Sequence, residues 1–402
     1  MKKGSNQMRN PFATRLSQIP PYLFQELDEL RAKIKGDLID LGEGSPDQPP
    51  PRPILAAFTK ALRKPENHRY PTYAGKLSTR RAVAAWYRRR FGVVLDPETE
   101  ITLLLGSKEG VAHLIWGVCG PGDVVAVTTP GYPVYANQCR LAGASLMKMP
   151  LTEHNRFLPD LDWLSRSASR LKLVCINYPN NPTAAVAPKE FYEQLVELAL
   201  KFGFYIVNDN VYSEIYFGPK PPPSILEVSG ARTCCLEFHS LSKSFNMAGW
   251  RIGMAVGNRG LIQALLKVKQ NTDTGPFGAI QDAAVYALRN SNRLTAVLRR
   301  MYQHRQDTFC RTLTKAGWPV TRPEATFYVW TRVPERFTTR RRGSRSLAFV
   351  EEMLAKTRVM AAPGTGFGEG GEGFVRFALV ATEKQLKQAA RRIGRWLTAL
   401  RD

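Results

Sequence analysis

The sequence has no long uninterrupted apolar run, and this absence excludes a membrane-spanning helix. A helix that crosses a bilayer needs about 18 consecutive apolar residues, and no stretch of the 402 residues approaches that length. The basic N-terminus MKKGSNQMRN is not followed by an apolar segment, because Pro11, Arg15 and Gln18 interrupt the sequence there. This pattern predicts no secretory signal. We therefore expect a cytoplasmic protein with no membrane partner.

The chain also has few cysteines and few acidic residues. Its six cysteines show no paired metal-ligand spacing, and Cys234 and Cys235 are merely adjacent. We therefore expect reduced, mostly buried thiols and no metal site. Lysine and arginine outnumber aspartate and glutamate by 57 to 34, which gives a net charge of +23. These basic residues are scattered, at 88–90, 299–300 and 340–345 for example, and no aromatic-interleaved recognition motif accompanies them. This favours solvated helix faces that steer anionic ligands over a nucleic-acid partner.

What the sequence does contain is the pattern of an α/β protein. A hydrophobic fraction of 44% is ordinary for a globular chain, and 402 residues exceed the size of one core, so we expect two domains. Apolar runs that predict buried strands alternate with segments of helical periodicity. The clearest strands are Val124–Thr129, Leu171–Asn177, Phe204–Asn208 and Cys234–Phe238. Residues 189–202 carry apolar side chains at helical spacing, which predicts an amphipathic helix ending at Gly203.

Changes of pattern along the chain predict three parts. Residues 1–50 form an N-terminal arm that we assign to a small domain, and a proline-rich linker leads from it into a large domain over residues 51–290. Residues 291–402 contain long basic helices that flank two strand-like segments, Ala325–Val333 and Gly373–Ala381. This last part predicts a smaller α+β domain.

The strongest chemical signal is Ser240-Leu241-Ser242-Lys243, followed by the segment GWRIG at 249–253. It directly follows a predicted buried strand, in a loop where a lysine is desolvated. Burial lowers the pKa of a lysine, and the neutral amine is a nucleophile toward an aldehyde. The two serines and Arg251 supply the donors that a phosphate dianion needs. Taken alone, the segment has a surface loop rich in serine and lysine as its alternative.

Polar residues also follow three other predicted strands. Asp209 ends one of them, where a carboxylate can pair with a protonated pyridine nitrogen or, alternatively, cap a helix. The segment NYPNNPT at 177–183 follows another, and a strand-end asparagine there can donate to a phenolate oxygen or simply form a turn. GSKEG at 106–110 joins the strand Ile101–Leu105 to a helix expected to begin at Val111, and such a turn suits a phosphate. The order of these signals, each at the end of a separate strand, is specific.

Over residues 20–395 the chain resembles the fold-type I aminotransferases of class I and II, and within them most closely the LL-diaminopimelate aminotransferases. The segments that carry the likeness are HRYPTYAGKLSTRRAV, GSKEGVAHL, PGYPVY, LAGA, FLPDLDWL, NYPNNPT, SILEVSGA, EFHSLSKSFNMAGWRIGMAVGN and ATFYVW. The resemblance implies a large domain with a mostly parallel seven-stranded sheet, a smaller α+β domain and the cofactor pyridoxal 5'-phosphate. It also implies a homodimer with shared active sites.

The resemblance assigns roles around the cofactor. Lys243 would form the Schiff base and shuttle protons, and Tyr132 would stack on the pyridine ring. Asp209 would pair with the ring nitrogen, while Asn181 and Tyr212 would hydrogen-bond the ring oxygen. The groups around the phosphate would be Ser107, Lys108, Ser240, Ser242 and Arg251, together with the partner subunit's Tyr70.

The resemblance also implies a substrate site and a reaction. Arg376 would clamp the α-carboxylate as a fork, and the other substrate contacts would be Gly44, Tyr22, Asn181 and Lys108. The predicted reaction transfers an amino group from LL-diaminopimelate to 2-oxoglutarate in lysine biosynthesis. An alanine- or aspartate-type aminotransferase and a β-lyase are alternatives that share the same lysine. A cofactor-binding transcription regulator is a further alternative, although the segment before Gly42 is too short for a DNA-binding domain.

Three places depart from the family pattern. Ala184 stands where the usual Asn-Pro-Thr-Gly has glycine, and we expect this substitution to strain the turn. The other departures are the asparagines on either side of Asp209, Asn208 and Asn210, and the arm residues Glu43 and Ser45. None of them removes a group that the shared chemistry needs.

Overall fold

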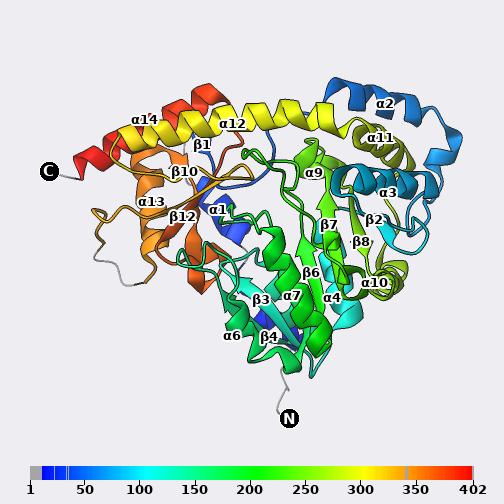
Figure 1. The fold of residues 1–402 in the computed structure, drawn as a ribbon. Helices are drawn as coiled ribbons and strands as arrows, with labels where there is room; N and C mark the ends of the chain where they lie inside the picture. Colours follow the sequence, from blue (N-terminus) through cyan, green and yellow to red (C-terminus); the bar gives the residue numbers. More distant parts are fainter. Residues whose placement is uncertain (1–10, 22, 33, 35, 340–342, 401–402) are drawn as a thin grey trace, which may run out of the picture.

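The computed structural model describes residues 11–21, 23–32, 34, 36–339 and 343–400 (Figure 1). Its centre is a seven-stranded sheet in the order β2-β8-β7-β6-β5-β3-β4. The strands are β2 (Ile101–Leu104), β3 (Val124–Thr129), β4 (Ser145–Pro150), β5 (Leu171–Ile176), β6 (Tyr205–Asp209), β7 (Cys235–Ser240) and β8 (Gly253–Gly257). β8 runs antiparallel to both of its neighbours, β2 and β7, and all the other strand pairs of this sheet are parallel. The predicted mostly parallel seven-stranded sheet is confirmed.

In the seven-stranded sheet the predicted strand ends are correct to within one or two residues, whereas the predicted segments Ala325–Val333 and Gly373–Ala381 each overrun their strands by up to three. The apolar run predicts the end of β6 at Asn208, but the ladder continues until Asp209 pairs with Phe238 on β7. Because Asp209 is polar, the apolar pattern of β6 ends one residue before the backbone hydrogen bonds of the strand end. Asp209 is therefore the last residue of its strand, held rigidly by the sheet.

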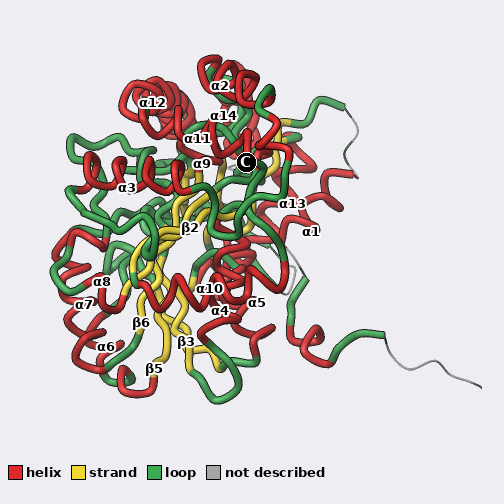
Figure 2. The backbone as a smooth tube through the Cα atoms, turned by 90° about the vertical axis from the view of Figure 1, so that its right-hand side faces the viewer, coloured by secondary structure: helices red, strands yellow, loops and turns green. Residues whose placement is uncertain are grey.

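Helices cover both faces of this sheet, as Figure 2 shows. Alternate residues of each strand point to opposite faces, so that on β5 Leu173 and Cys175 join one apolar cluster while Val174 and Ile176 join another. One face packs against α3 (Leu77–Phe91), α7 (Lys189–Phe202) and α11 (Gly278–Arg289). The other packs against α4 (Ser107–Val118), α5 (Val134–Ala142) and α10 (Arg259–Thr272). The predicted helix at 189–202 matches α7, whose C-cap Gly203 has the expected positive φ.

The prediction that α4 begins at Val111 is wrong by one turn. The helix begins at Ser107, because Ser107 and Lys108 already have helical geometry although they are polar. Apolar periodicity marks only the buried part of a helix, and this first turn faces a cavity. The correction places the helix N-terminus closer to the predicted phosphate-binding turn.

A smaller α+β region follows the sheet in sequence. It contains a three-stranded antiparallel sheet in the order β11-β12-β9, formed by β11 (Ala362–Pro363), β12 (Phe374–Ala378) and β9 (Tyr328–Arg332). The N-terminal β1 (Ile39–Asp40) pairs with β10 (Val359–Met360), which ties the arm to this region. The helices are α12 (Ser291–Lys315), α13 (Arg345–Thr357) and α14 (Glu383–Ala399). The proposed domain boundary after residue 290 falls at the start of α12, which runs along the top of Figure 1 beside α14.

The remaining helices are α1 (Leu23–Ala32), α2 (Arg52–Leu62), α6 (Leu161–Ser165), α8 (Ala231–Cys234) and α9 (Leu241–Ser244). Among the described residues, no helix has the length and apolar character needed to cross a membrane. All six cysteines are buried and carry free thiols.

Candidate active site

One cavity gathers most of the predicted site residues. It has a volume of about 470 Å³ and lies at the sheet edge where β3, β5, β6 and β7 end. Carboxyl ends of parallel strands meet at one edge, so the side chains that follow them converge. The predicted residues that line the cavity are Gly44, Ser107, Lys108, Tyr132, Asn181, Asp209, Tyr212, Lys243 and Arg251.

The turn between β2 and α4 presents a helix N-terminus to this cavity. Gly106 has a φ of +91°, a backbone conformation that side chains other than glycine rarely adopt, so the turn favours glycine. Glu109 accepts a hydrogen bond from the backbone N of Leu105 (2.8 Å) and pairs with the buried Lys269 at 3.0 Å. These contacts hold the turn in place. The first N–H groups of α4 have no acceptor inside the helix, and with Arg251 they form a cradle suited to a phosphate.

Asp209 is a buried carboxylate with one oxygen left without a partner. Its side chain lies at the tip of β6 and is 4% exposed. The hydroxyl of Tyr135 donates to Oδ2 at 2.7 Å, whereas Oδ1 accepts no hydrogen bond from any described residue. Burial raises the pKa of Asp209 to about 7, although the hydrogen bond from Tyr135 and the nearby Lys243 oppose the shift. An oxygen in this state suits a ligand that brings its own N–H donor.

Lys243 lies opposite, on the short helix α9 that directly follows β7. Its Nζ donates to the carbonyl of Gly44 at 2.6 Å. The side chain keeps some accessible surface because it faces the cavity, but the surrounding protein desolvates it. That burial, together with Arg376 and Arg251, lowers the pKa of Lys243 to about 8. A substantial fraction of the amine is therefore neutral and nucleophilic near neutral pH.

Arg376 lies at the centre of β12 and has no exposed surface. Its Nη1 donates to Oδ1 of Asn181 at 2.8 Å and its Nη2 to the carbonyl of Gly42 at 2.5 Å. The guanidinium also lies over the ring of Tyr328, 4.3 Å from the centroid. Arg376 does not itself line the cavity, but it contacts Asn181, which does. The small region thus presents a fixed cation to the large sheet, suited to a carboxylate.

Gly44 and Tyr212 both lie against Tyr328, which forms part of the cavity wall. The hydroxyls of Tyr212 and Tyr328 lie 2.8 Å apart. A Cβ atom on residue 44 would come within 2.1 Å of the Tyr328 hydroxyl, so this arm position requires glycine. The arm can therefore approach the cavity closely enough for the carbonyl of Gly44 to reach Lys243.

Besides Arg376, four predicted site residues lie outside the cavity or are not described. Ser240 and Ser242 are buried beside Lys243 but do not line the cavity, and the Ser240 hydroxyl accepts from the Ser242 N–H to cap α9. Tyr70 is 93% exposed and lies outside the cavity of its own chain. Tyr22 lies outside the described residues.

Sequence reasoning missed two tyrosines of the cavity, Tyr135 and Tyr328. Both lie in segments that carried the family resemblance, PGYPVY and ATFYVW. For Tyr135 the available signal was its position three residues after the cavity residue Tyr132, in the first turn of α5. No pattern in the sequence distinguishes Tyr328 from an ordinary aromatic residue of the core.

The departures from the family pattern have structural consequences. Ala184 adopts the left-handed conformation with a φ of +62°, so the expected strain in this turn is present. Asn208 is fully buried, donates to Glu237 at 2.9 Å and accepts from the backbone N of Tyr178 at 3.1 Å. It therefore ties β6 to the segment that carries Asn181.

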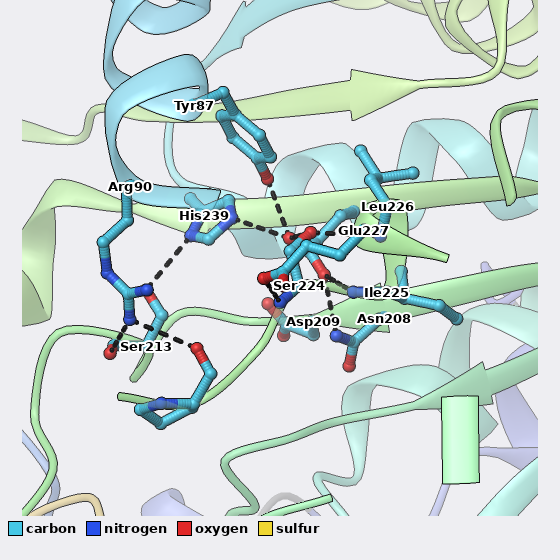
Figure 3. A network of polar contacts seen from close by, with 12 residues as sticks. Tyr87, Arg90, Asn208, Asp209, Ser213, Ser224, Ile225, Leu226, Glu227 and His239 are labelled. Carbon is cyan, nitrogen blue, oxygen red and sulfur yellow. Dashed lines mark hydrogen bonds and ion pairs between the residues drawn. The ribbon is translucent and has the colours of Figure 1, made fainter. Parts of the chain in front are cut away.

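Glu237 is a second buried carboxylate and forms a saturated network, of which Figure 3 labels the donors Tyr87, Asn208, Ser224, Ile225 and His239. It lies on β7 directly opposite Asn208 and has no exposed surface. Its five hydrogen-bond donors are Tyr87 Oη (2.8 Å), Ser224 Oγ (2.7 Å), Ile225 N (3.1 Å), Asn208 Nδ2 (2.9 Å) and His239 Nε2 (3.0 Å). Burial opposes ionisation, but the contacts from His239, Ser224 and Tyr87 outweigh it and lower the pKa of Glu237. Sequence reasoning did not identify this residue.

Comparison with known proteins agrees with this geometry. The family model for class I and II aminotransferases matches residues 36–393. An LL-diaminopimelate aminotransferase of Aquifex aeolicus is 48% identical, over 95% of this chain and 98% of that protein. The substrate-bound structure of BacF from Bacillus subtilis is 36% identical with a TM-score of 0.90, covering 96% of this chain and 98% of that one. A probable N-succinyldiaminopimelate aminotransferase from Thermus thermophilus is also 36% identical, with a TM-score of 0.84 and coverages of 93% and 99%.

The residues present fit the family's cofactor. Pyridoxal phosphate carries an aldehyde, a protonated pyridine nitrogen and a phosphate. The cavity offers a lysine with a lowered pKa for the first, the unpartnered Oδ1 of Asp209 for the second and the N-terminus of α4 with Arg251 for the third. This match of geometry, family model and relatives shows that the chain belongs to the class I and II aminotransferases, enzymes that use pyridoxal phosphate to transfer amino groups.

Proposed function

We propose that this enzyme transfers the amino group of LL-diaminopimelate to an oxo acid such as 2-oxoglutarate, in lysine biosynthesis. The observation that carries the proposal is the likeness, at 48% identity over nearly the whole of both chains, to a relative that bears this name. Further relatives with the same name are 44–47% identical over 95% of this chain. An aminotransferase of the alanine or aspartate type shares with this proposal only the residues that bind the α-amino group and the α-carboxylate, which every amino acid carries.

Each of the three central residues has one task in this reaction. When bound, pyridoxal phosphate supplies the electron sink that lets an amino acid lose its α-proton. Lys243, with its pKa near 8, takes that proton in its neutral form and returns it later. Asp209 in its ionised form keeps the ring nitrogen protonated through Oδ1. Arg376, which contacts the cavity residue Asn181, supplies the cation that pairs with the α-carboxylate and so places the α-carbon near Lys243.

We assign recognition of the distal end of the substrate to two charged residues of the cavity wall, Glu43 and Lys108. LL-diaminopimelate carries a second ammonium and a second carboxylate, and this wall presents one group of each opposite sign. A site that pairs charged groups of its substrate rejects an analogue that lacks them far more strongly than a site that only loses a methylene contact. Glu43 and Lys108 are therefore the side chains that would separate diaminopimelate from alanine.

The decisive experiment compares amino donors. We expect kcat/KM for LL-diaminopimelate to exceed that for meso-diaminopimelate, lysine, aspartate and alanine by at least about tenfold, or about 1.4 kcal/mol of transition-state discrimination. Glu43→Gln should lower kcat/KM for LL-diaminopimelate and leave that for alanine nearly unchanged. A tenfold preference for alanine or aspartate would contradict the proposed substrate. Turnover without an oxo-acid acceptor would indicate a lyase.

We also propose that the enzyme works as a homodimer in the cytoplasm. Tyr70 supports the dimer, because an aromatic side chain that is 93% exposed suits a contact with a second subunit. The free thiols support a reducing compartment. Mixing inactive Lys243→Ala with inactive Tyr70→Ala protein should restore activity through hybrid dimers. Hybrids that form but stay as inactive as their parents would contradict a shared site.

A further inference from the structure

Tyr135 is the side chain that connects Asp209 to the helix beneath the cofactor site. It lies on the first turn of α5, three residues after Tyr132, and its side chain is 1% exposed. Its ring meets that of Tyr132 edge to face, with centroids 5.8 Å apart. Its hydroxyl donates to Oδ2 of Asp209 at 2.7 Å. Tyr135 thus contacts both residues that would hold the pyridine ring.

We propose that Tyr135 is a positioning residue that fixes the carboxylate of Asp209, so that Oδ1 faces the ring nitrogen of the cofactor and remains ionised. The inference rests on the role assigned to Asp209 and adds a group that acts through it. The geometry supports it directly, because Tyr135 occupies Oδ2 and leaves Oδ1 as the oxygen without a donor among the described residues.

The hydroxyl of Tyr135 acts as a permanent donor. Burial and the adjacent Asp209 raise the pKa of Tyr135 well above its usual value, so the hydroxyl keeps its proton at any working pH. The hydrogen bond favours the ionised form of Asp209, which burial disfavours. The other charged groups that act on Asp209 are Lys243, which favours ionisation, and Glu237 across the sheet, which opposes it. Without Tyr135, Lys243 alone would oppose desolvation.

The chain offers a matched control on the other face of the sheet. Tyr87 is also fully buried, and its hydroxyl donates to the buried carboxylate of Glu237 at 2.8 Å (Figure 3). Tyr135→Phe and Tyr87→Phe therefore remove the same atom from the same kind of contact. Glu237 keeps four other donors and lies outside the cavity. A merely structural role predicts the same outcome for both variants.

The test uses both variants reconstituted with pyridoxal phosphate labelled with ¹⁵N in the ring. For Tyr135→Phe we expect kcat to fall about 10- to 100-fold, as for a lost hydrogen bond to a charged group, with KM for the amino donor nearly unchanged. The ¹⁵N chemical shift should move toward that of an unprotonated pyridine, and the dissociation constant of the cofactor should rise. Tyr87→Phe should change neither the shift nor the turnover per bound cofactor.

A Tyr135→Phe enzyme with the kcat and the ¹⁵N shift of the unmodified enzyme would overturn the proposal. Equal changes in both variants would overturn it as well, since they would indicate a general loss of packing. Failure of the underlying role has a different signature. If Asp209→Asn itself keeps normal turnover and a protonated ring nitrogen, then Asp209 does not hold the ring and Tyr135 has nothing to position.

Discussion

Two buried carboxylates lie on neighbouring strands of the same sheet, and the protein treats them in opposite ways. Glu237 on β7 accepts five hydrogen bonds, and these lower its pKa despite complete burial. Asp209 on β6 accepts one side-chain hydrogen bond, and burial raises its pKa to about 7. Both side chains are carboxylates, and both are buried. They differ only in how many donors the fold supplies.

The number of donors distinguishes a buried carboxylate that stabilises the fold from one that is left to bind a ligand. A carboxylate whose lone pairs are all filled holds elements together, and Glu237 joins α3, β6, β7 and the loop at 224–225 in this way. A carboxylate with one free oxygen is unfavourable until a ligand supplies the missing donor. The cofactor site therefore costs stability in the empty protein and regains it on binding.

The largest expected effect on the functional side belongs to Lys243. Lys243→Ala should lower transamination by about 10⁴-fold or more, because it removes both the nucleophile and the proton carrier. The fold should remain intact, since the side chain makes a single hydrogen bond, to the carbonyl of Gly44. Reduction with borohydride should no longer attach the cofactor to the protein, and mass spectrometry measures this. A covalently attached cofactor in the variant would remove the central assignment.

Asp209→Asn should lower kcat by about 100-fold or more, an effect typical of a lost electrostatic group in an active site. A neutral amide cannot keep the pyridine nitrogen protonated, although it fills the same space. Steady-state kinetics at saturating cofactor measure the change. Rates near those of the unmodified enzyme would place Asp209 in the same structural class as Glu237.

Glu237→Gln should show the reverse pattern. Removing the charge from a hydrogen-bonded buried network should lower the free energy of unfolding by about 3 kcal/mol, as measured by urea denaturation. Turnover per bound cofactor should change by no more than a few-fold, because Glu237 does not line the cavity. A large loss of turnover at unchanged stability would contradict this division of roles.

The smallest expected effect concerns the backbone near the functional side. Ala184 has a φ of +62°, which glycine adopts without steric cost. Ala184→Gly should raise the free energy of unfolding by about 0.5 to 1 kcal/mol, the net of relieved strain and added chain entropy. Thermal unfolding at matched cofactor loading measures it. A lower melting temperature would show that the turn tolerates alanine without strain.

The sequence predicts the residues that would contact the cofactor better than it predicts the residues that hold them in place. Apolar runs predict Lys243 and Asp209, because strand ends converge in a parallel sheet, whereas the family resemblance singles out Asn181. Tyr135 and Glu237 leave no such signal, since their importance comes from neighbours that are distant in sequence, such as Asp209 and Tyr87. The start of α4 was placed late for a related reason, because its first turn is polar and faces the cavity.

The contrast between the two carboxylates is tested most directly by the stability of the cofactor-free Asp209→Asn protein across pH. The pKa of Asp209 is raised from an ordinary 3.8 to about 7 in the fold, so its protonated form is the favoured one. Below about pH 4 the carboxyl group is protonated in both the folded and the unfolded protein and does not change the free energy of unfolding. Between about pH 4 and pH 7 that free energy falls as the pH rises, and the loss is complete above about pH 7.

Urea denaturation should find the Asp209→Asn and unmodified proteins about equally stable at pH 4. At pH 8 the variant should be more stable by about 4 kcal/mol, the equivalent of the shift in pKa from 3.8 to about 7. Glu237→Gln, measured beside it, should be the less stable protein at pH 8. An Asp209→Asn protein that is also destabilised at pH 8 would contradict the account.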